Sequence, residues 1–227
     1  MNEVTRPTAV IGDVHGLDCW RQVVQSHPGC RVVFLGDYLD PIDYVPRRDL
    51  LANLRAIIAL RRARPSDVVL LLGNHDLHYF STDAPICSRF DWQIGDKASL
   101  LFLENIDAFQ YAFQDGRTIF THAGIAHGWF VNDFKGDISR PIADQLNNPS
   151  DGQVEALCRV GQLRGGKQGT TGGIFWADSD ELADPLHGFT QVVGHNRVEE
   201  VTTHEGGDGG KIVFCDCLWN GNYLFME

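Results

Sequence analysis

Short runs of apolar residues recur along the first third of the chain, and each is followed by a polar loop that contains glycine and aspartate. The runs cover residues 8–12, 31–36 and 67–73 and are rich in valine, isoleucine and leucine. Continuous apolar runs of this length are typical of parallel strands that are buried on both faces. The sequence therefore predicts three parallel strands at the start of the fold.

Two segments between these runs have the spacing of amphipathic helices. Residues 18–27 begin with Asp18, a residue type that often caps a helix N-terminus. Residues 49–64 carry an apolar stripe at helical spacing, and Pro65 then prevents the helix from continuing. Strand and helix therefore alternate, which predicts a βαβαβ unit.

The second half of the chain has a different pattern. A helix is predicted over residues 97–107, and short helices over residues 126–163. The pair Asp115-Gly116 between two apolar runs indicates a β-hairpin, with strands over residues 109–113 and 118–121. Four late strands are predicted over residues 189–194, 198–203, 211–216 and 223–226, with a glycine-rich hairpin tip at 205–210. We expect this later sheet to be more antiparallel than the first.

Composition supports one globular unit. Of the 227 residues, 43% are hydrophobic and 22% are charged, as in ordinary globular proteins. This length fits a single domain with its own core. We therefore predict a mixed α/β (α+β) fold in one domain over residues 1–227.

Charge and cysteine content exclude several classes of protein. The net charge of -11 argues against a surface that binds nucleic acid, because such surfaces are basic. The first ten residues contain no long apolar segment, so we expect neither a signal peptide nor membrane insertion, and we predict a cytoplasmic location. The six scattered cysteines favour reduced thiols. Cys215 and Cys217 alternate along a predicted strand and are expected to share a buried face.

Five short motifs contain the residues best suited to chemistry. They are GDVHG (12–16), GDYLD (36–40), GNHD (73–76), THAG (121–124) and GHN (194–196). Each follows an apolar run, so each lies where a strand ends, which is where open α/β sheets bind ligands. Aspartate, histidine and asparagine side chains suit manganese, iron, zinc or magnesium. Asp13 and His15 are two residues apart, so in an extended segment both side chains point to one side and can bind the same ion.

The order and spacing of these motifs resemble the calcineurin-like metallophosphoesterase superfamily, in particular its serine/threonine phosphoprotein phosphatase branch. Arg197 stands where other branches have a second histidine, and Trp176-Ala177-Asp178 is similar to a Trp-Ser-Asp segment of this branch. The resemblance covers residues from about Val10 to Asp216. It implies the metallophosphoesterase fold, a four-layer-type β-sandwich flanked by helices.

The resemblance also implies a site for two divalent metal ions, with manganese favoured and iron, zinc or magnesium as alternatives. Asp37 would bridge the ions, and His75 would donate a proton to the leaving group while Asp40 orients it. A metal-activated water would then hydrolyse the ester in one step. The implied metal ligands are Asp13, His15, Asp37, Asn74, His122 and His195.

The arginines that bind phosphate in this branch are missing from their usual positions. Asp40 is followed by Pro41 instead of arginine, and residues 179–190 contain no arginine. The glycine-rich segment 165–173 could cover the cleft or form a surface loop. Four arginines are candidates for the missing role: Arg47, Arg48, Arg164 and Arg197.

These observations predict a dimetal phosphoesterase that hydrolyses phosphate monoesters on a phosphoprotein or a nucleotide. An alternative is a hydrolase of dinucleoside polyphosphates or nucleotide pyrophosphates, because the same ions can cleave an anhydride. A phosphodiesterase and a non-catalytic binding module on the same fold rank lower. The oligomeric state is not predicted.

The other histidines are assigned structural or surface roles: His27, His78, His127, His187 and His204. Of these, His78 and His127 lie near enough in sequence to the motifs to line a cleft.

Overall fold

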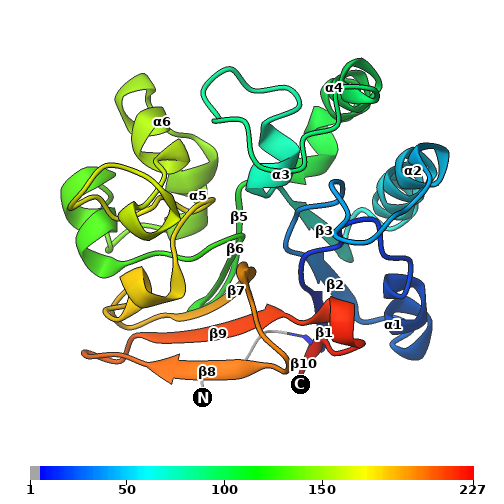
Figure 1. Ribbon diagram of the computed structural model, residues 1–227. Coiled ribbons are helices and arrows are strands. Elements are labelled where there is room, and N and C mark those ends of the chain that lie inside the picture. The colour runs from blue at the N-terminus through cyan, green and yellow to red at the C-terminus, as the bar shows by residue number, and fades with distance from the viewer. Residues whose placement is uncertain (1–5) are drawn as a thin grey trace.

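The computed structural model describes residues 6–227 and contains two five-stranded sheets (Figure 1). The strand order is β10-β1-β2-β3-β4 in the first sheet and β5-β6-β7-β9-β8 in the second. The first sheet comprises β1 (Thr8–Ile11), β2 (Arg31–Phe34), β3 (Val68–Leu71), β4 (Phe109–Gln110) and β10 (Leu224–Met226). The second comprises β5 (Ala112–Asp115), β6 (Thr118–Thr121), β7 (Thr190–Arg197), β8 (Thr202–Glu205) and β9 (Lys211–Asp216).

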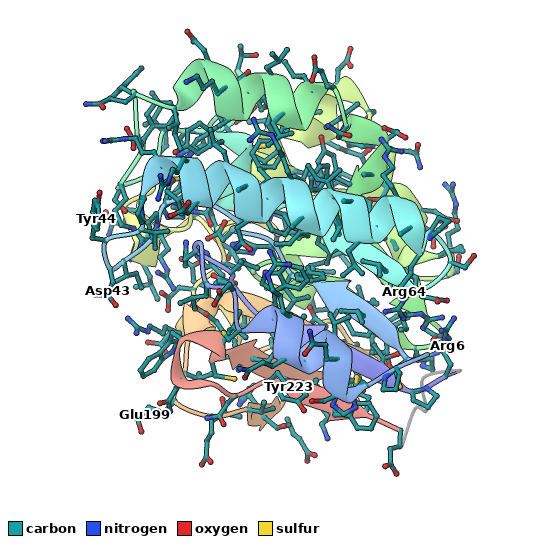
Figure 2. The ribbon with its side chains drawn as sticks, turned by 90° about the vertical axis from the view of Figure 1, so that its right-hand side faces the viewer. Arg6, Asp43, Tyr44, Arg64, Glu199 and Tyr223 are labelled. Carbon is teal, nitrogen blue, oxygen red and sulfur yellow. The ribbon has the colours of Figure 1, made fainter. Side chains whose placement is uncertain are left out.

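Helices lie on both outer sides of the pair of sheets. In Figure 1, α1, α2 and α4 are on one side, and α5 and α6 are on the other. Figure 2 views the first of these sides, where α2 crosses the molecule between α1 and α4. The α-helices are α1 (Trp20–Ser26), α2 (Arg47–Ala63), α3 (Asn74–Leu77), α4 (Gly95–Leu103), α5 (Ile142–Asn147) and α6 (Asp151–Cys158). Shorter turns are η1 (Ile106–Ala108), η2 (Trp129–Asp133), η3 (Gln162–Arg164), η4 (Ser179–Leu182) and η5 (Leu218–Asn220).

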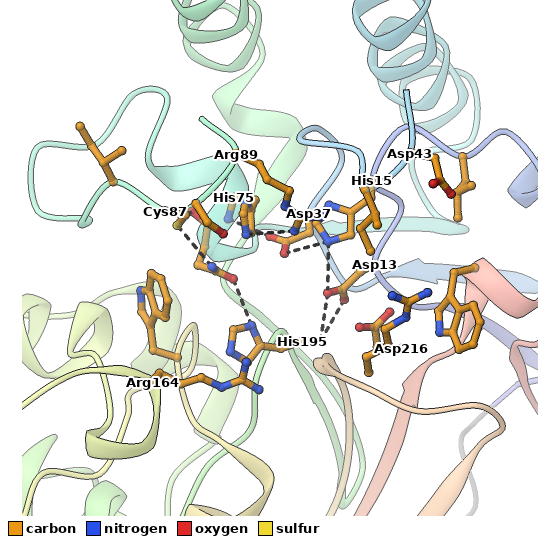
Figure 3. Close-up of a pocket in the computed structure, with 18 residues that line it drawn as sticks. Asp13, His15, Asp37, Asp43, His75, Cys87, Arg89, Arg164, His195 and Asp216 are labelled. Carbon is orange, nitrogen blue, oxygen red and sulfur yellow. Dashed lines mark hydrogen bonds and ion pairs between the residues drawn. The ribbon is translucent and has the colours of Figure 1, made fainter. Parts of the chain in front are cut away.

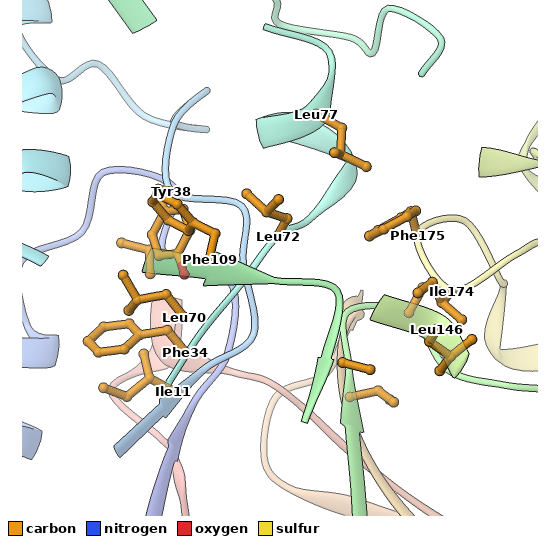
Figure 4. Packing of buried hydrophobic residues seen from close by; sticks show 14 of the residues in the cluster. Ile11, Phe34, Tyr38, Leu70, Leu72, Leu77, Phe109, Leu146, Ile174 and Phe175 are labelled. Carbon is orange, nitrogen blue, oxygen red and sulfur yellow. The ribbon is translucent and has the colours of Figure 1, made fainter. Parts of the chain in front are cut away.

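Alternate side chains of β1, β2 and β3 point to opposite faces of the first sheet and pack in two separate cores. Ile11 and Phe34 belong to the larger core, which the helices cover (Figure 4). Val10 and Val33 point the other way and pack with Phe120 of the second sheet in a smaller core. Strands buried on both faces are what the continuous apolar runs predict. The predicted mixed α/β fold, with two sheets flanked by helices, is therefore confirmed.

Strand direction also agrees with the prediction for the first sheet. β1, β2, β3 and β4 pair in parallel, and β10 joins β1 antiparallel. The second sheet is mixed. Its outer pairs, β5–β6 and β8–β9, are antiparallel hairpins, whereas its central pairs, β6–β7 and β7–β9, are parallel. Parallel strands place the ends of β6 and β7 at one edge, beside the corresponding ends of β1, β2 and β3.

Three local predictions are wrong in detail. Helix α1 begins at Trp20 with Cys19 at its N-cap, so Asp18 does not cap it. The strand predicted over 109–113 is interrupted at Tyr111, because the amide oxygen of Asn147 accepts the backbone N–H groups of Tyr111 and Ala112. Its two halves join different sheets. The strand predicted over 198–203 begins only at Thr202.

Two other expectations concern the cysteines and membranes. All six cysteines are free, and Cys215 and Cys217 are buried in the smaller core, as their alternation predicted. Within residues 6–227, no helix combines the length and the apolar character needed to cross a bilayer.

Candidate metal centre

The five motifs meet at one edge of the two sheets, around a cavity of about 550 Å³ (Figure 3). Asp13 and His15 follow β1, and Asp37 follows β2. Asn74 begins α3 directly after β3, His122 follows β6, and His195 lies within β7. The structure therefore brings together all six side chains that the sequence nominated as metal ligands: Asp13, His15, Asp37, Asn74, His122 and His195.

The backbone of this edge is left-handed at four of the functional residues. The φ angles of His15, Asp37, Asp40 and His195 lie between 42° and 58°. A residue with a side chain adopts this conformation at a cost of about 1 kcal/mol or more. Such strain concentrates at functional sites, where the surrounding structure holds it in place.

Two glycines are required because the carboxylates of Asp37 and Asp13 approach the backbone closely. A Cβ atom on Gly73 would lie 2.1 Å from Asp37 Oδ1, and one on Gly194 would lie 2.2 Å from Asp13 Oδ1. Any larger residue at either position would displace the carboxylate. This explains why glycine precedes the functional residues in both motifs.

Asp13, His15 and Asp37 form the first group of donors. His15 Nε2 lies 3.6 Å from Asp37 Oδ2 and 4.0 Å from Asp13 Oδ2. The other ring nitrogen, Nδ1, donates to the carbonyl oxygen of Leu39 at 2.8 Å. That hydrogen bond leaves a lone pair on Nε2, directed toward the two carboxylates.

The second group shares Asp37 with the first. His122 Nε2 lies 3.6 Å from Asp37 Oδ2 and 2.9 Å from Asn74 Oδ1. His195 Nδ1 lies 3.1 Å from the same amide oxygen. His122 Nδ1 donates to the carbonyl oxygen of Leu35 at 2.9 Å, so Nε2 of His122 also carries a lone pair.

A cation fits this arrangement better than protons do. Burial lowers the pKa values of His15 and His122 to about 3, so both rings are neutral at ordinary pH. Their lone pairs face Asp37 Oδ2, itself an acceptor, and acceptors that face one another need a positive charge between them. Burial, followed by the charges of neighbouring carboxylates, raises the pKa values of Asp13 and Asp37. Two divalent ions, one in each group with Asp37 between them, would satisfy all of these donors.

His75 and Asp40 form a buried pair beside the donor groups. His75 Nδ1 lies 2.8 Å from Asp40 Oδ2, and Nε2 of the same ring faces the cavity. Burial lowers the pKa of His75, although Asp40 opposes that effect. Burial would raise the pKa of Asp40, but hydrogen bonds from His75 and Tyr79 and the nearby His78 ring outweigh it, and the pKa is lowered.

Two other residues that contact Asp40 were not predicted to belong to the site. His78 Nε2 lies 2.8 Å from Asp40 Oδ2, and the Tyr79 hydroxyl donates to Asp40 Oδ1. His78 Nδ1 accepts the backbone N–H of Cys87 at 3.1 Å, which places the ring proton on Nε2. His78 follows His75 by three residues along a helical turn, and this spacing could have indicated that the two share a face.

Asp76 joins two of the motif loops. Its carboxylate accepts the backbone N–H groups of Asp37 at 2.7 Å, Tyr38 at 2.9 Å and Gly73 at 2.8 Å. Burial raises the pKa of Asp76 to about 7, and these three donors oppose the increase. The fourth residue of the GNHD motif thus fixes the loop that carries Asp37.

Two further residues in the cavity were not predicted. Asp216, at the end of β9, faces Asp13 (Figure 3), and burial raises its pKa to about 6. Cys87 contacts Asn74, with the amide Nδ2 donating to Sγ at 3.3 Å. Both lie outside any recognisable motif, so the sequence contained no signal for them.

The four candidate arginines have different positions. Arg47 pairs with Asp91 and Arg48 with Asp49, and neither lines the cavity. Arg164 lines the cavity and pairs with Asp178 at 2.7 Å. Arg197 also lines it, with its guanidinium 3.9 Å from the centre of the Trp219 ring. A third arginine of the cavity wall, Arg89, was not among the candidates.

The glycine-rich segment and the remaining histidines lie elsewhere. None of residues 165–173 lines the cavity, which favours the surface-loop interpretation. His27 contacts Tyr223, and the rings of His127 and His187 stack at 3.5 Å. His204 is exposed on β8. Of the five histidines assigned structural or surface roles, His78 is thus the one that contacts Asp40.

The chain belongs to the calcineurin-like phosphoesterase family, whose sequence model matches residues 6–210. This result confirms the resemblance seen in the motifs and makes the chain a hydrolase of phosphoric esters. The family typically uses a dinuclear metal site, and the two donor groups described above contain residues that could bind metal ions.

Solved structures of phosphatases share the fold. A cold-active protein-tyrosine phosphatase from a psychrophilic Shewanella species is 14% identical, with a TM-score of 0.59 over 98% of this chain and 80% of that chain. A protein serine/threonine phosphatase from Saccharomyces cerevisiae is 14% identical, with a TM-score of 0.51 over 95% of this chain and 68% of that chain. At these identities the likeness concerns the fold alone. No curated protein sequence was found to match.

Proposed function

We propose that the protein is a phosphatase that hydrolyses phosphate monoesters with two divalent metal ions, manganese being favoured. The observation that carries this proposal is the position of Asp37. Its Oδ2 atom lies 3.6 Å from Nε2 of both His15 and His122, which belong to different donor groups. A carboxylate shared in this way suits two ions side by side, an arrangement that serves in-line displacement at phosphorus.

Each residue of the site has a defined task in this proposal. The first group (Asp13, His15 and Asp37) and the second group (Asp37, Asn74, His122 and His195) would hold the ions. When bound, the ions supply a hydroxide from water near neutral pH and offset the charge of the phosphate.

His75 would protonate the departing oxygen. Its Nε2 atom faces the cavity, while Asp40 accepts the proton of Nδ1 and so fixes the orientation of the ring. Asp40 also stabilises the positive charge that the ring carries before it transfers the proton. No nucleophilic side chain is required, because water attacks directly.

A second candidate is hydrolysis of a dinucleoside polyphosphate or a nucleotide pyrophosphate. The size and walls of the cavity favour it. The volume of about 550 Å³ is in the range of pockets that hold whole organic ligands, and Ile42, Ile86, Trp176 and Trp219 line it. Indole rings could stack on a nucleobase.

Release of phosphate from p-nitrophenyl phosphate tests the first candidate. We expect the protein loaded with manganese to release phosphate, and the metal-free protein and the Asp37→Asn variant to be inactive. Arg48→Gln is the matched control, because Arg48 is exposed and outside the cavity. Products of diadenosine tetraphosphate incubation distinguish the second candidate. A metal-loaded protein that hydrolyses neither substrate would indicate a non-catalytic binding module, and activity of the metal-free protein would contradict the metal-dependent mechanism.

A further inference from the structure

Three arginines line the cavity, and Arg89 is the one whose guanidinium contacts His75. Arg164 is held by the Asp178 carboxylate at 2.7 Å and by Asn196 Oδ1 at 2.6 Å. Arg197 lies over the Trp219 ring. Within residues 6–227, the side-chain partner found for Arg89 is His75, with Nη2 at 3.4 Å from Nε2.

The loop between α3 and α4 fixes Arg89 from both sides. Two residues earlier, the Cys87 backbone N–H donates to His78 Nδ1 at 3.1 Å, and the thiol contacts Asn74. One residue later, the Phe90 ring packs on His78 and Tyr79, with ring centres 4.8 and 4.7 Å away. Arg89 lies between these contacts with a φ of 66°. This left-handed backbone is costly for arginine, and it is the kind of strain that accompanies functional side chains.

Arg89 also contacts His75 at Nε2, the ring nitrogen that does not contact Asp40. In the site without substrate, His75 donates through Nδ1 to Asp40 and Nε2 accepts from Arg89. Once the guanidinium binds phosphate oxygens instead, Nε2 would be free to carry the proton for the leaving oxygen. Arg89 and His75 both line the cavity, so the guanidinium lies next to the ring nitrogen that would meet the leaving oxygen (Figure 3). A planar guanidinium can bind two oxygens of one phosphate at once.

We propose that Arg89 is the specificity-determining residue that binds the terminal phosphate of the substrate, in place of the arginines absent after Asp40 and within 179–190. This inference rests on the proposed phosphatase function. Arg89 would hold two unesterified oxygens and so present the leaving oxygen to His75. The substrate class is therefore a phosphate with one ester or anhydride link, because a diester has two free oxygens, which leaves none for the ions once Arg89 holds both, and it carries less charge.

The test measures binding of inorganic phosphate to the manganese-loaded protein by calorimetry, apart from any turnover. We expect Arg89→Gln to weaken phosphate binding by about ten- to a hundredfold, the effect of losing charged hydrogen bonds. Arg89→Lys, which keeps the charge but not the planar fork, should lie in between, and Arg48→Gln should match the wild type. Metal stoichiometry and thermal midpoint, measured on every variant, show that the site and fold are intact.

Measurements of kcat/KM on a monoester and a diester then test whether Arg89 determines the preference for monoesters. Arg89→Gln should lower kcat/KM for p-nitrophenyl phosphate by a similar factor and change that for bis-p-nitrophenyl phosphate by less than about threefold. Phosphate binding within about twofold of the wild type in a metal-loaded Arg89→Gln protein, or no phosphate binding by the wild type, would overturn the proposal. If the wild type binds phosphate through Arg89 yet hydrolyses no monoester, the phosphatase function fails while the binding role of Arg89 stands.

Discussion

The side chain of Cys87 contacts both the side-chain amide and the backbone carbonyl of Asn74, and the first contact fixes the direction of that amide. Nδ2 of Asn74 donates to Cys87 Sγ at 3.3 Å, and the thiol donates to the backbone carbonyl oxygen of Asn74 at 3.2 Å. With Nδ2 engaged in this way, Oδ1 must point toward His122 and His195. Burial raises the pKa of the Cys87 thiol to about 12, so it remains protonated and can act as a donor.

We predict that Cys87→Ala weakens the second metal ion selectively. Without the sulfur, the amide can rotate and present nitrogen to the ion, and loss of such an outer contact typically costs about ten- to a hundredfold in metal affinity. Calorimetric titration of metal-free protein with manganese should show one unchanged and one weakened site. Cys87→Ser keeps a donor and an acceptor and should recover most of the affinity. Two unchanged sites in Cys87→Ala would contradict this role.

The catalytic pair predicts a dependence on the leaving group. Phenyl phosphate has a poorer leaving group than p-nitrophenyl phosphate and depends more on proton donation. His75→Asn should therefore lower kcat by about 10²–10⁴ for phenyl phosphate and by clearly less for p-nitrophenyl phosphate. Equal losses on both substrates would argue that His75 does not donate the proton.

Tyr79→Phe should show the same pattern with a smaller amplitude. The hydroxyl of Tyr79 donates to Asp40 Oδ1, and removing one hydrogen bond to a buried carboxylate is expected to lower kcat for phenyl phosphate about tenfold. Tyr44→Phe is the control, since Tyr44 is 90% exposed and does not line the cavity. A Tyr79→Phe protein as active as the control would remove Tyr79 from the network.

Asp76 is expected to contribute to the stability of the fold and to have no direct part in catalysis. An asparagine in its place could accept two of the three backbone N–H groups, but the amide nitrogen would face the third donor. We predict that Asp76→Asn lowers the free energy of unfolding of the metal-free protein by about 2–3 kcal/mol. The measurement is urea denaturation at about pH 8, above the pKa of Asp76, where the carboxylate is ionised. Asp83→Asn, in an exposed loop, should change stability by less than about 0.5 kcal/mol.

Metal affinity should rise with pH because of the carboxylates. Because the pKa values of Asp13 and Asp37 are raised, these carboxyls hold their protons to higher pH than an exposed aspartate does, and the ions must displace those protons. His15 and His122, with pKa values of about 3, are already neutral and release no protons. Binding therefore releases protons, and observed affinity weakens as pH falls. Calorimetry in two buffers of different ionisation enthalpy measures the release. Affinity that stays constant between about pH 5.5 and 7.5 would contradict the prediction.

The fold and the convergence of the candidate metal ligands could be predicted because local patterns determine them. Continuous apolar runs gave the parallel strands, and parallel strands place the residues that follow them at one edge, so the motifs had to converge. The interruption at Tyr111 depends on Asn147, more than thirty residues away, and no periodicity reveals such a contact.

The residues that support the ligands were harder to predict. Arg89 and Cys87 lie in an irregular loop whose path is set by tertiary contacts with His78 and Tyr79. Asp216 ends a strand whose position beside β1 follows from the packing of the two sheets. Sequence patterns predict the positions of the candidate metal ligands, whereas the positions of the residues that contact those ligands depend on tertiary packing.

The metal centre itself can be tested with crystals of the manganese-loaded protein, measured on either side of the manganese absorption edge. The account predicts two anomalous peaks about 3.5–4 Å apart, with Asp37 between them. One peak would be surrounded by Asp13 and His15, and the other by Asn74, His122 and His195. A single peak, or peaks that do not contact Asp37, would contradict the central claim.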